Sequence, residues 1–309
     1  MSIVGRWGAV LAALLTSAGL LAPAPASAGD DLPVPYTFLT SAVTAGTRVD
    51  ADPPGANLWD CAPSARHPRP VVLVHGTLGN KNTNWQTYAP LLKNHGYCVF
   101  ALTYGVPAGT PPGLDQFGGL ARMQDSAEQL GQFVAEVLRR TGARQVDVIG
   151  HSQGTVVPEY WAKFLGGARY VHDYISLAPL WHGTRIADPL TLPMAAFGLS
   201  EDQVPLCTAC AQFRPASEFM TRLRAGGLKV GRIDYTNIVT RYDELVAPYT
   251  SGIQRGMRNV VLQDLCDQDF SEHFEIAASP TAAQVVLNTL DPAHAQPVTC
   301  RLVLPFVGS

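Results

Sequence analysis

The sequence predicts an α/β fold with a mainly parallel sheet and helices on both of its faces. Short apolar or β-branched runs alternate along the chain with longer segments of helical periodicity, which is the pattern of repeated strand–helix units. In one such unit the run at 146–149 passes directly into helix-compatible sequence through Gly150-His151-Ser152-Gln153-Gly154. In sheets of this class ligands bind beyond the carboxyl ends of the strands, and the residues singled out below fall at such ends.

The motif at 150–154 is the strongest single signal in the chain. A strand that turns into a helix through Gly-x-Ser-x-Gly is a nucleophile elbow, which pushes its serine out at the carboxyl edge of the sheet. We expect a strained backbone at Ser152, and glycines at 150 and 154 because a Cβ at either position would collide with the neighbouring strand or helix. The alternative is a glycine-rich turn with an incidental serine, which the strand–turn–helix context disfavours.

The other elements follow from periodicity and turn signals. Residues 29–69 contain several prolines and little periodicity, and are expected to run extended over the surface. Strands are expected at 70–74, 97–103, 170–177, 233–240 and 259–265. Helices are expected at 84–94, 115–141 with Gly142 as C-cap, 153–165 with a kink or a shift in its first turns at Pro158, 217–224, and after Ser279-Pro280.

The first 28 residues have the layout of a secretory signal peptide. Arg6 supplies a basic n-region, residues 9–21 an apolar core, and Ala26-Ser27-Ala28 a small-residue cleavage site. The apolar stretch is too short to span a bilayer comfortably and no stop-transfer sequence follows it. We therefore expect a secreted protein with no integral membrane segment after cleavage, whose residues 29–309 form a single domain.

Charge and composition bear on the partners and on the core. Without Arg6 the chain has 21 basic and 25 acidic side chains, a formal charge of −4, which argues against a nucleic-acid partner. Charged residues make up 15% of the chain, below the roughly 25% of typical globular proteins, so we expect a large core. Residues 181–230, rich in Pro, Gly and Ala, are expected to form a cap over Ser152 rather than a plain surface excursion.

All six cysteines lie after the signal segment, and an even number in an exported protein predicts three disulfides. The sequence alone leaves 15 connectivities open for six cysteines. Cys207-x-x-Cys210 could instead be a redox pair or half of a metal site. It lies in a loop-like stretch with no second ligand pair at zinc spacing, so we expect a structural disulfide and neither a metal nor a cofactor.

A serine nucleophile needs a general base, and in this fold the chain order is Ser, then Asp or Glu, then His. Four histidines follow Ser152. His172 begins a strand, His182 leaves no room for the acid, and His294 lies beyond the last helix. His273 lies on a loop at the correct edge of the sheet and is the predicted base, with a solvated loop histidine as the alternative.

The acid is expected directly after the strand at 233–240. Asp243 comes first and has the shorter reach usual for this role, Glu244 is the alternative, and Asp234 lies inside the strand. The oxyanion requires two fixed N–H donors. We expect the amides of Gln153 and Thr77, with the Thr77 hydroxyl as a further donor, and we interpret His75 as a structural residue that orients the Thr77 loop.

At this point the chain resembles a known group, the secreted actinobacterial lipases, and is similar to fungal lipase B of the Candida antarctica type. The segments that carry the resemblance across residues 55–300 are Val71–Thr77, Gly150–Gly154, Ala178-Pro179 to Gly183-Thr184, Asp243-Glu244 to Ala247-Pro248, and Cys266–His273. The resemblance implies an α/β-hydrolase fold with a cap-like insertion. It also implies Ser152, Asp243 and His273 as the triad and Thr77 and Gln153 as the oxyanion donors. The implied disulfides are Cys61–Cys98, Cys207–Cys210 and Cys266–Cys300. The chain departs from the fungal enzyme by a histidine in the elbow and a different 185–230 region, so acyl preference does not transfer.

These residues lead to the hypothesis of a secreted, monomeric serine carboxylester hydrolase that acts on lipid esters or at a lipid–water interface and needs no cofactor. A short-chain esterase, an acyltransferase or a polyester hydrolase would use the same residues. A non-catalytic binding or redox module that uses Cys207 and Cys210 is the alternative from another class.

Overall fold

Six parallel strands form one sheet in the order β2-β1-β3-β4-β5-β6. Their bounds are Val71–Val74 (β1), Val99–Leu102 (β2), Val146–His151 (β3), Val171–Leu177 (β4), Asp234–Val239 (β5) and Arg258–Val261 (β6). Every pairing is parallel, so the carboxyl ends of all six strands lie along one edge of the sheet. This confirms the predicted fold class.

The structure is a computed structural model that describes residues 31–190, 200 and 206–309. The predicted signal segment at 1–28 and part of the predicted cap therefore lie outside the described residues. Among the described residues, no helix is long and apolar enough to cross a membrane.

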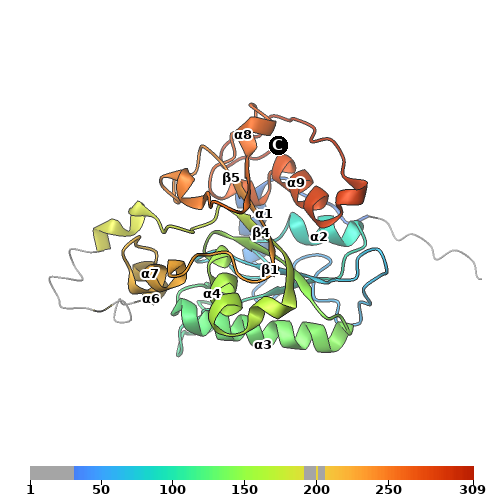
Figure 1. The fold of residues 1–309 in the computed structure, drawn as a ribbon. Helices are drawn as coiled ribbons and strands as arrows, with labels where there is room; N and C mark the ends of the chain where they lie inside the picture. The colour runs from blue at the N-terminus through green and yellow to red at the C-terminus, as the bar shows by residue number, and fades with distance from the viewer. Residues whose placement is uncertain (1–30, 191–199, 201–205) are drawn as a thin grey trace, which may run out of the picture. The chain divides into compact units, whose positions relative to one another are not determined.

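The two faces of the sheet have separate cores. In β1, Val72 and Val74 pack into one apolar cluster, and Val71 and Leu73 into the other, as the alternation of side chains along a strand requires. Figure 1 shows α3 and α4 together on one side of the strands and α2 and α9 on the other. The helix bounds are Tyr88–Asn94 (α2), Met123–Thr141 (α3), Val157–Phe164 (α4) and Pro280–Leu290 (α9). The predicted mainly parallel sheet with helices on both faces is thus confirmed.

The helix caps and the helix-start proline that the sequence indicates are present in the structure. Gly142 follows α3 in the left-handed region with φ of 69°. Ser279 accepts the N–H of Ala282 at the start of α9, and Pro158 lies in the first turn of α4. Ser217 caps α7 (Glu218–Arg224) in the same way as Ser279 caps α9.

Five expectations for individual elements were wrong or too long. Residues 29–69 are not simply extended, because α1 (Phe38–Gly46) forms within them. The segment at 115–122 is not helical, and α3 begins only at Met123; the helix expected at 84–94 begins at Tyr88. Strand β6 ends at Val261 and is followed by one helical turn, α8 (Leu262–Leu265). The stretch around Cys207 is not a loop, because Cys207 caps the short helix α6 (Thr208–Gln212).

The core contains a buried acid, Glu159. It lies on α4, is fully buried, and accepts the Tyr235 hydroxyl at 2.9 Å through Oε2. Its Oε1 atom has no hydrogen-bond partner among the described residues. Burial raises the pKa of Glu159 to about 8, against the weaker opposing effects of Tyr235 and Lys163. The side chain is therefore held as the neutral acid at neutral pH.

Glu159→Gln is expected to flatten the pH dependence of stability. Since the pKa of Glu159 is about 8 in the folded protein and 4.5 ordinarily, the folded state keeps a proton between these pH values that the unfolded chain releases. The free energy of unfolding thus falls as pH rises through this window, and the glutamine variant should remove a part of the fall on the order of a few kcal/mol. Urea unfolding at pH 5 and pH 8 measures it.

The matched control is Glu128→Gln, the same change of charge at an exposed position on α3. It should leave the slope of the free energy of unfolding against pH as in the parent. An identical slope in the parent and in Glu159→Gln would contradict the assignment of a neutral buried acid.

Candidate active site

The elbow has the strained geometry that its sequence requires. Ser152 has φ of 55°, in the left-handed region that residues other than glycine rarely adopt. A Cβ on Gly150 would lie 2.0 Å from the carbonyl oxygen of Gly154, and one on Gly154 would lie 2.0 Å from that of Val74. Only glycine fits at both positions, so strand, turn and helix can close up and hold Ser152 at the tip.

Ser152, His273 and Asp243 come together in one line of hydrogen bonds. His273 Nε2 lies 2.9 Å from Ser152 Oγ, and His273 Nδ1 lies 2.9 Å from Asp243 Oδ1. The side chains of His273 and Asp243 are only 4% and 2% exposed. Because a carboxylate only accepts, Nδ1–H donates to Asp243, which leaves the Nε2 lone pair free to accept the Ser152 hydroxyl.

The turn after β5 fixes the carboxylate and separates the roles of the two candidate acids. Oδ1 of Asp243 also accepts the backbone N–H groups of Leu245 and Val246, at 3.1 and 2.7 Å. Glu244 accepts the backbone N–H of His273 at 3.2 Å and makes no hydrogen bond to its ring. Of the two acids that the sequence offered, only Asp243 can therefore orient the imidazole.

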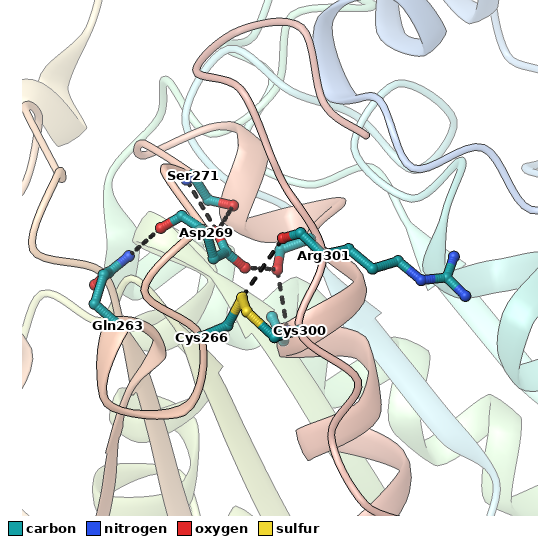
Figure 2. Close-up of a disulfide and its surroundings, with 8 residues drawn as sticks. Gln263, Cys266, Asp269, Ser271, Cys300 and Arg301 are labelled. Atoms are coloured by element: carbon teal, nitrogen blue, oxygen red, sulfur yellow. Dashed lines mark hydrogen bonds between the residues drawn. A yellow bond between two sulfur atoms is a disulfide. The ribbon is translucent and has the colours of Figure 1, made fainter.

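The loop that carries His273 is cross-linked and filled with polar contacts (Figure 2). A disulfide joins Cys266 at its start to Cys300 near the C-terminus. The carbonyl of Asp269 accepts Gln263 Nε2 at 2.7 Å, and its carboxylate accepts both the N–H and the hydroxyl of Ser271. These bonds hold a loop without regular secondary structure in one conformation.

His151, inside the elbow, is buried and hydrogen-bonded to the backbone of His273. Its Nε2–H donates to the backbone carbonyl of His273 at 2.8 Å. Burial, and next the neighbouring His273, lower the pKa of His151 to about 3, so the ring is neutral. The ring beside Ser152 thus fixes the backbone of His273 without adding a charge.

The loop after β1 contains Thr77, one of the two predicted oxyanion donors, and several hydrogen bonds hold it. The N–H of Gly76 donates to Asn84 Oδ1 at 3.2 Å, and His75 Nδ1–H donates to the Gly76 carbonyl at 2.7 Å. Burial lowers the pKa of His75 to about 4, so this histidine orients the loop as a neutral ring. The Thr77 hydroxyl donates to Gln153 Oε1 at 2.8 Å, so in this structure it is not free to be the additional donor that the sequence suggested.

A cavity of about 780 Å³ opens at Ser152 and His273. Its lining includes Thr77 and is otherwise mostly apolar, with contributions from the loop after β1, from α1, and from two parts of the predicted cap. The cap residues in the lining are Thr184, Ile186, Ala187, Cys210 and Phe213. An apolar cavity of this size with one polar, reactive end suits an ester that carries an aliphatic chain.

The other candidate groups lie elsewhere. His172, His182 and His294 do not line this cavity. Asp147, His172 and Asp173 place three metal-ligand atoms within 4.8 Å of one another, near the amino ends of β3 and β4. Arg69 already donates to Asp147 at 2.7 Å and to Asp173 at 3.2 Å, so a guanidinium supplies the positive charge that these carboxylates need.

All six cysteines are paired, as Cys61–Cys98, Cys207–Cys210 and Cys266–Cys300. These are the pairs that the resemblance implied.

Two features of the site were missed at the level of sequence. One is Asn84, which holds Gly76, and the other is α1, which lines the cavity. The only available signal for α1 was the spacing of Phe38, Ala42 and Gly46, and for Asn84 there was none.

The family comparison agrees with this geometry. The model of the family described as Lipase (class 2) matches residues 68–286, well over half of the sequence. The chain belongs to this lipase family. Its match begins just before β1 and ends within α9, so it contains the whole sheet together with Ser152, Asp243 and His273.

Two curated relatives carry the name triacylglycerol lipase. The protein from Pseudarthrobacter phenanthrenivorans is 35% identical over 98 residues, which are 30% of this chain and 28% of the relative. The protein from Burkholderia plantarii is 33% identical over 114 residues, which are 35% of this chain and 28% of the relative. The chain thus matches little more than a quarter of the length of either relative.

Solved structures of similar fold include two lipases. Aspergillus fumigatus lipase B aligns with a TM-score of 0.58 at 21% identity, over 77% of this chain and 56% of that chain. The mature form of Bacillus licheniformis lipase BlEst2 aligns with a TM-score of 0.54 at 16% identity, over 80% of this chain and 96% of that chain. The fold is the α/β-hydrolase fold.

Asp243→Asn is expected to lower kcat for ester hydrolysis by about 10³- to 10⁴-fold, because an amide no longer selects the His273 tautomer that accepts the serine proton. Glu244→Gln is the matched control, since its amide oxygen can still accept the His273 backbone N–H. We expect it to stay within a few-fold of the parent. Steady-state hydrolysis of p-nitrophenyl butyrate measures both variants, and a larger loss in Glu244→Gln would reverse the assignment.

Proposed function

We propose that this protein is a secreted serine carboxylester hydrolase of the lipase type, which acts on acylglycerol or related fatty-acyl esters. The observation that carries the proposal is the line Ser152–His273–Asp243, with both distances at 2.9 Å, at the end of a mostly apolar cavity. Membership of the lipase family and the names of the two curated relatives support it.

The chemistry follows from the atoms that meet at the elbow. Ser152 Oγ attacks the ester carbonyl while His273 Nε2 takes its proton, and Asp243 keeps Nδ1 protonated and stabilises the imidazolium. The amides of Thr77 and Gln153 donate to the oxyanion. His273 then gives the proton to the departing alcohol, and a water molecule, deprotonated by the same nitrogen, hydrolyses the acyl-enzyme.

Secretion and a cap belong to the same proposal. The layout of residues 1–28 and the three disulfides support export to an oxidising compartment. Residues on both sides of 191–205 line the cavity, which supports 181–230 as a cap over Ser152 within a single domain at 29–309. The substrate would reach this cavity from a lipid–water interface.

Ser152→Ala is expected to lower kcat on p-nitrophenyl esters by about 10⁴- to 10⁶-fold, because the alanine has no nucleophile. The matched control is Ser176→Ala on the neighbouring strand β4, where Ser176 pairs in register with Gly150. Its buried hydroxyl has no partner among the described residues, so its removal should leave kcat unchanged.

The same panel should include emulsified long-chain triglyceride, which the parent protein is expected to hydrolyse. Equal rates for the parent and Ser152→Ala on every ester would refute the serine mechanism. If the parent protein hydrolysed only soluble short-chain esters, the proposed activity would be that of an esterase and not of a lipase.

A further inference from the structure

Helix α1 (Phe38–Gly46) lies outside the region that the lipase family model matches, yet it builds one wall of the cavity at Ser152. Phe38, Ala42, Val43 and Gly46 all line this cavity. Positions i, i+4, i+5 and i+8 form one stripe along a helix, so a single face of α1 is turned toward the substrate space. Residues of the predicted cap also contribute to the lining.

The helix is fixed to the body of the protein at both ends. At its start, the N–H of Phe38 donates to both carboxylate oxygens of Glu275, at 3.2 and 3.0 Å, two residues beyond His273. The Phe38 ring lies 5.9 Å from that of His151. At its end, Asn82 Nδ2 donates to the Ala45 carbonyl at 3.0 Å. The wall is thus attached to the segments that position the reacting groups.

The segment before α1 is also held by hydrogen bonds to the rest of the protein. Asn94 exchanges two hydrogen bonds with the backbone of Leu32, at 2.9 and 2.8 Å. The Thr87 hydroxyl donates to the Pro35 carbonyl at 2.6 Å, and the last residue, Ser309, donates its N–H to the Tyr36 carbonyl at 3.0 Å. Both termini of the described chain therefore secure α1 in place.

Small residues on the inner face leave the space open. Ala42 is partly buried, and a Cβ added at Gly46 would meet nothing closer than Thr83 at 3.8 Å. The lining also includes Ile186, Phe213 and Val246. The width available to an aliphatic chain at Ser152 therefore depends on side-chain size at positions 42 and 46.

We propose that α1, through Ala42 and Gly46, is the specificity-determining wall that sets how long an aliphatic chain the ester can carry at Ser152. The inference rests on the proposed function. It adds specificity-determining residues that lie outside the region matched by the family model. The aliphatic chain that α1 limits is part of either the acyl group or the alcohol group of the ester. Two substrate series distinguish these two possibilities.

The test compares Ala42→Trp with Thr40→Trp, the same substitution at an exposed position of α1 that does not line the cavity. Substrates are p-nitrophenyl esters from butyrate to palmitate, and butyrate esters of alcohols from ethanol to dodecanol. In one series Ala42→Trp should lower kcat/KM for the long chain relative to the short chain by about tenfold or more. Thr40→Trp should leave both series unchanged.

Ala42→Leu gives a graded version of the change if the tryptophan disturbs folding, and thermal unfolding verifies each variant. Parental selectivity in both series for Ala42→Trp and Ala42→Leu would overturn the proposal, as would an equal shift in Thr40→Trp.

Binding measurements keep this outcome separate from the proposed function. In the Ser152→Ala background, calorimetry with laurate and with dodecanol should show a loss of affinity for one of the two in Ala42→Trp and for neither in Thr40→Trp. Full activity of Ser152→Ala would refute the serine mechanism, whereas unchanged affinity for both laurate and dodecanol in Ala42→Trp would refute only the role of α1.

Discussion

The contact between the backbones of β1, β3 and the turn after Ser152 is the constraint on which the site depends. The carbonyls of Val74 and Gly154 occupy the space that a Cβ on Gly154 or Gly150 would need, and the price of that closeness is a left-handed backbone at Ser152. The closeness directs Oγ away from the sheet toward His273. Without two glycines, the strand and the helix would separate and the serine would lose its place.

The other parts of the site are tied to this elbow by buried, neutral hydrogen bonds. His151 holds the backbone of His273, Asn84 holds Gly76, and Thr77 is bonded to Gln153. The carboxylate of Asp243 is satisfied by two backbone amides and the ring of His273. The side-chain amide nitrogens of Asn84 and Gln153 have no hydrogen-bond partner among the described residues, so the network is not fully satisfied. Breaking any of its bonds would leave a further buried polar group without a partner, which favours the observed arrangement of Ser152, His273 and Asp243.

The sequence could predict the sheet, the elbow and the three aligned side chains because each has a local signal: apolar runs, two glycines at fixed spacing, and acidic and histidine residues after strand ends. Its failures have a different physical origin. Helix α1 has weak internal periodicity and is stabilised by distant partners such as Glu275 and Ser309, which no local pattern reveals. Tertiary contacts also decide that the segment at 115–122 is not helical, since Gly118 and Gly119 bond to Gly79 and Tyr104 instead.

The central claim is that the elbow makes Ser152 a nucleophile through His273. Reaction with a fluorophosphonate tests it most directly, because such reagents attach to a serine activated by a neighbouring base and not to ordinary hydroxyls. Intact-protein mass spectrometry followed by peptide mapping should find one adduct per chain, on the peptide that contains Ser152, and none after His273→Ala. An adduct on another residue, or equal labelling of Ser152 without His273, would contradict the account.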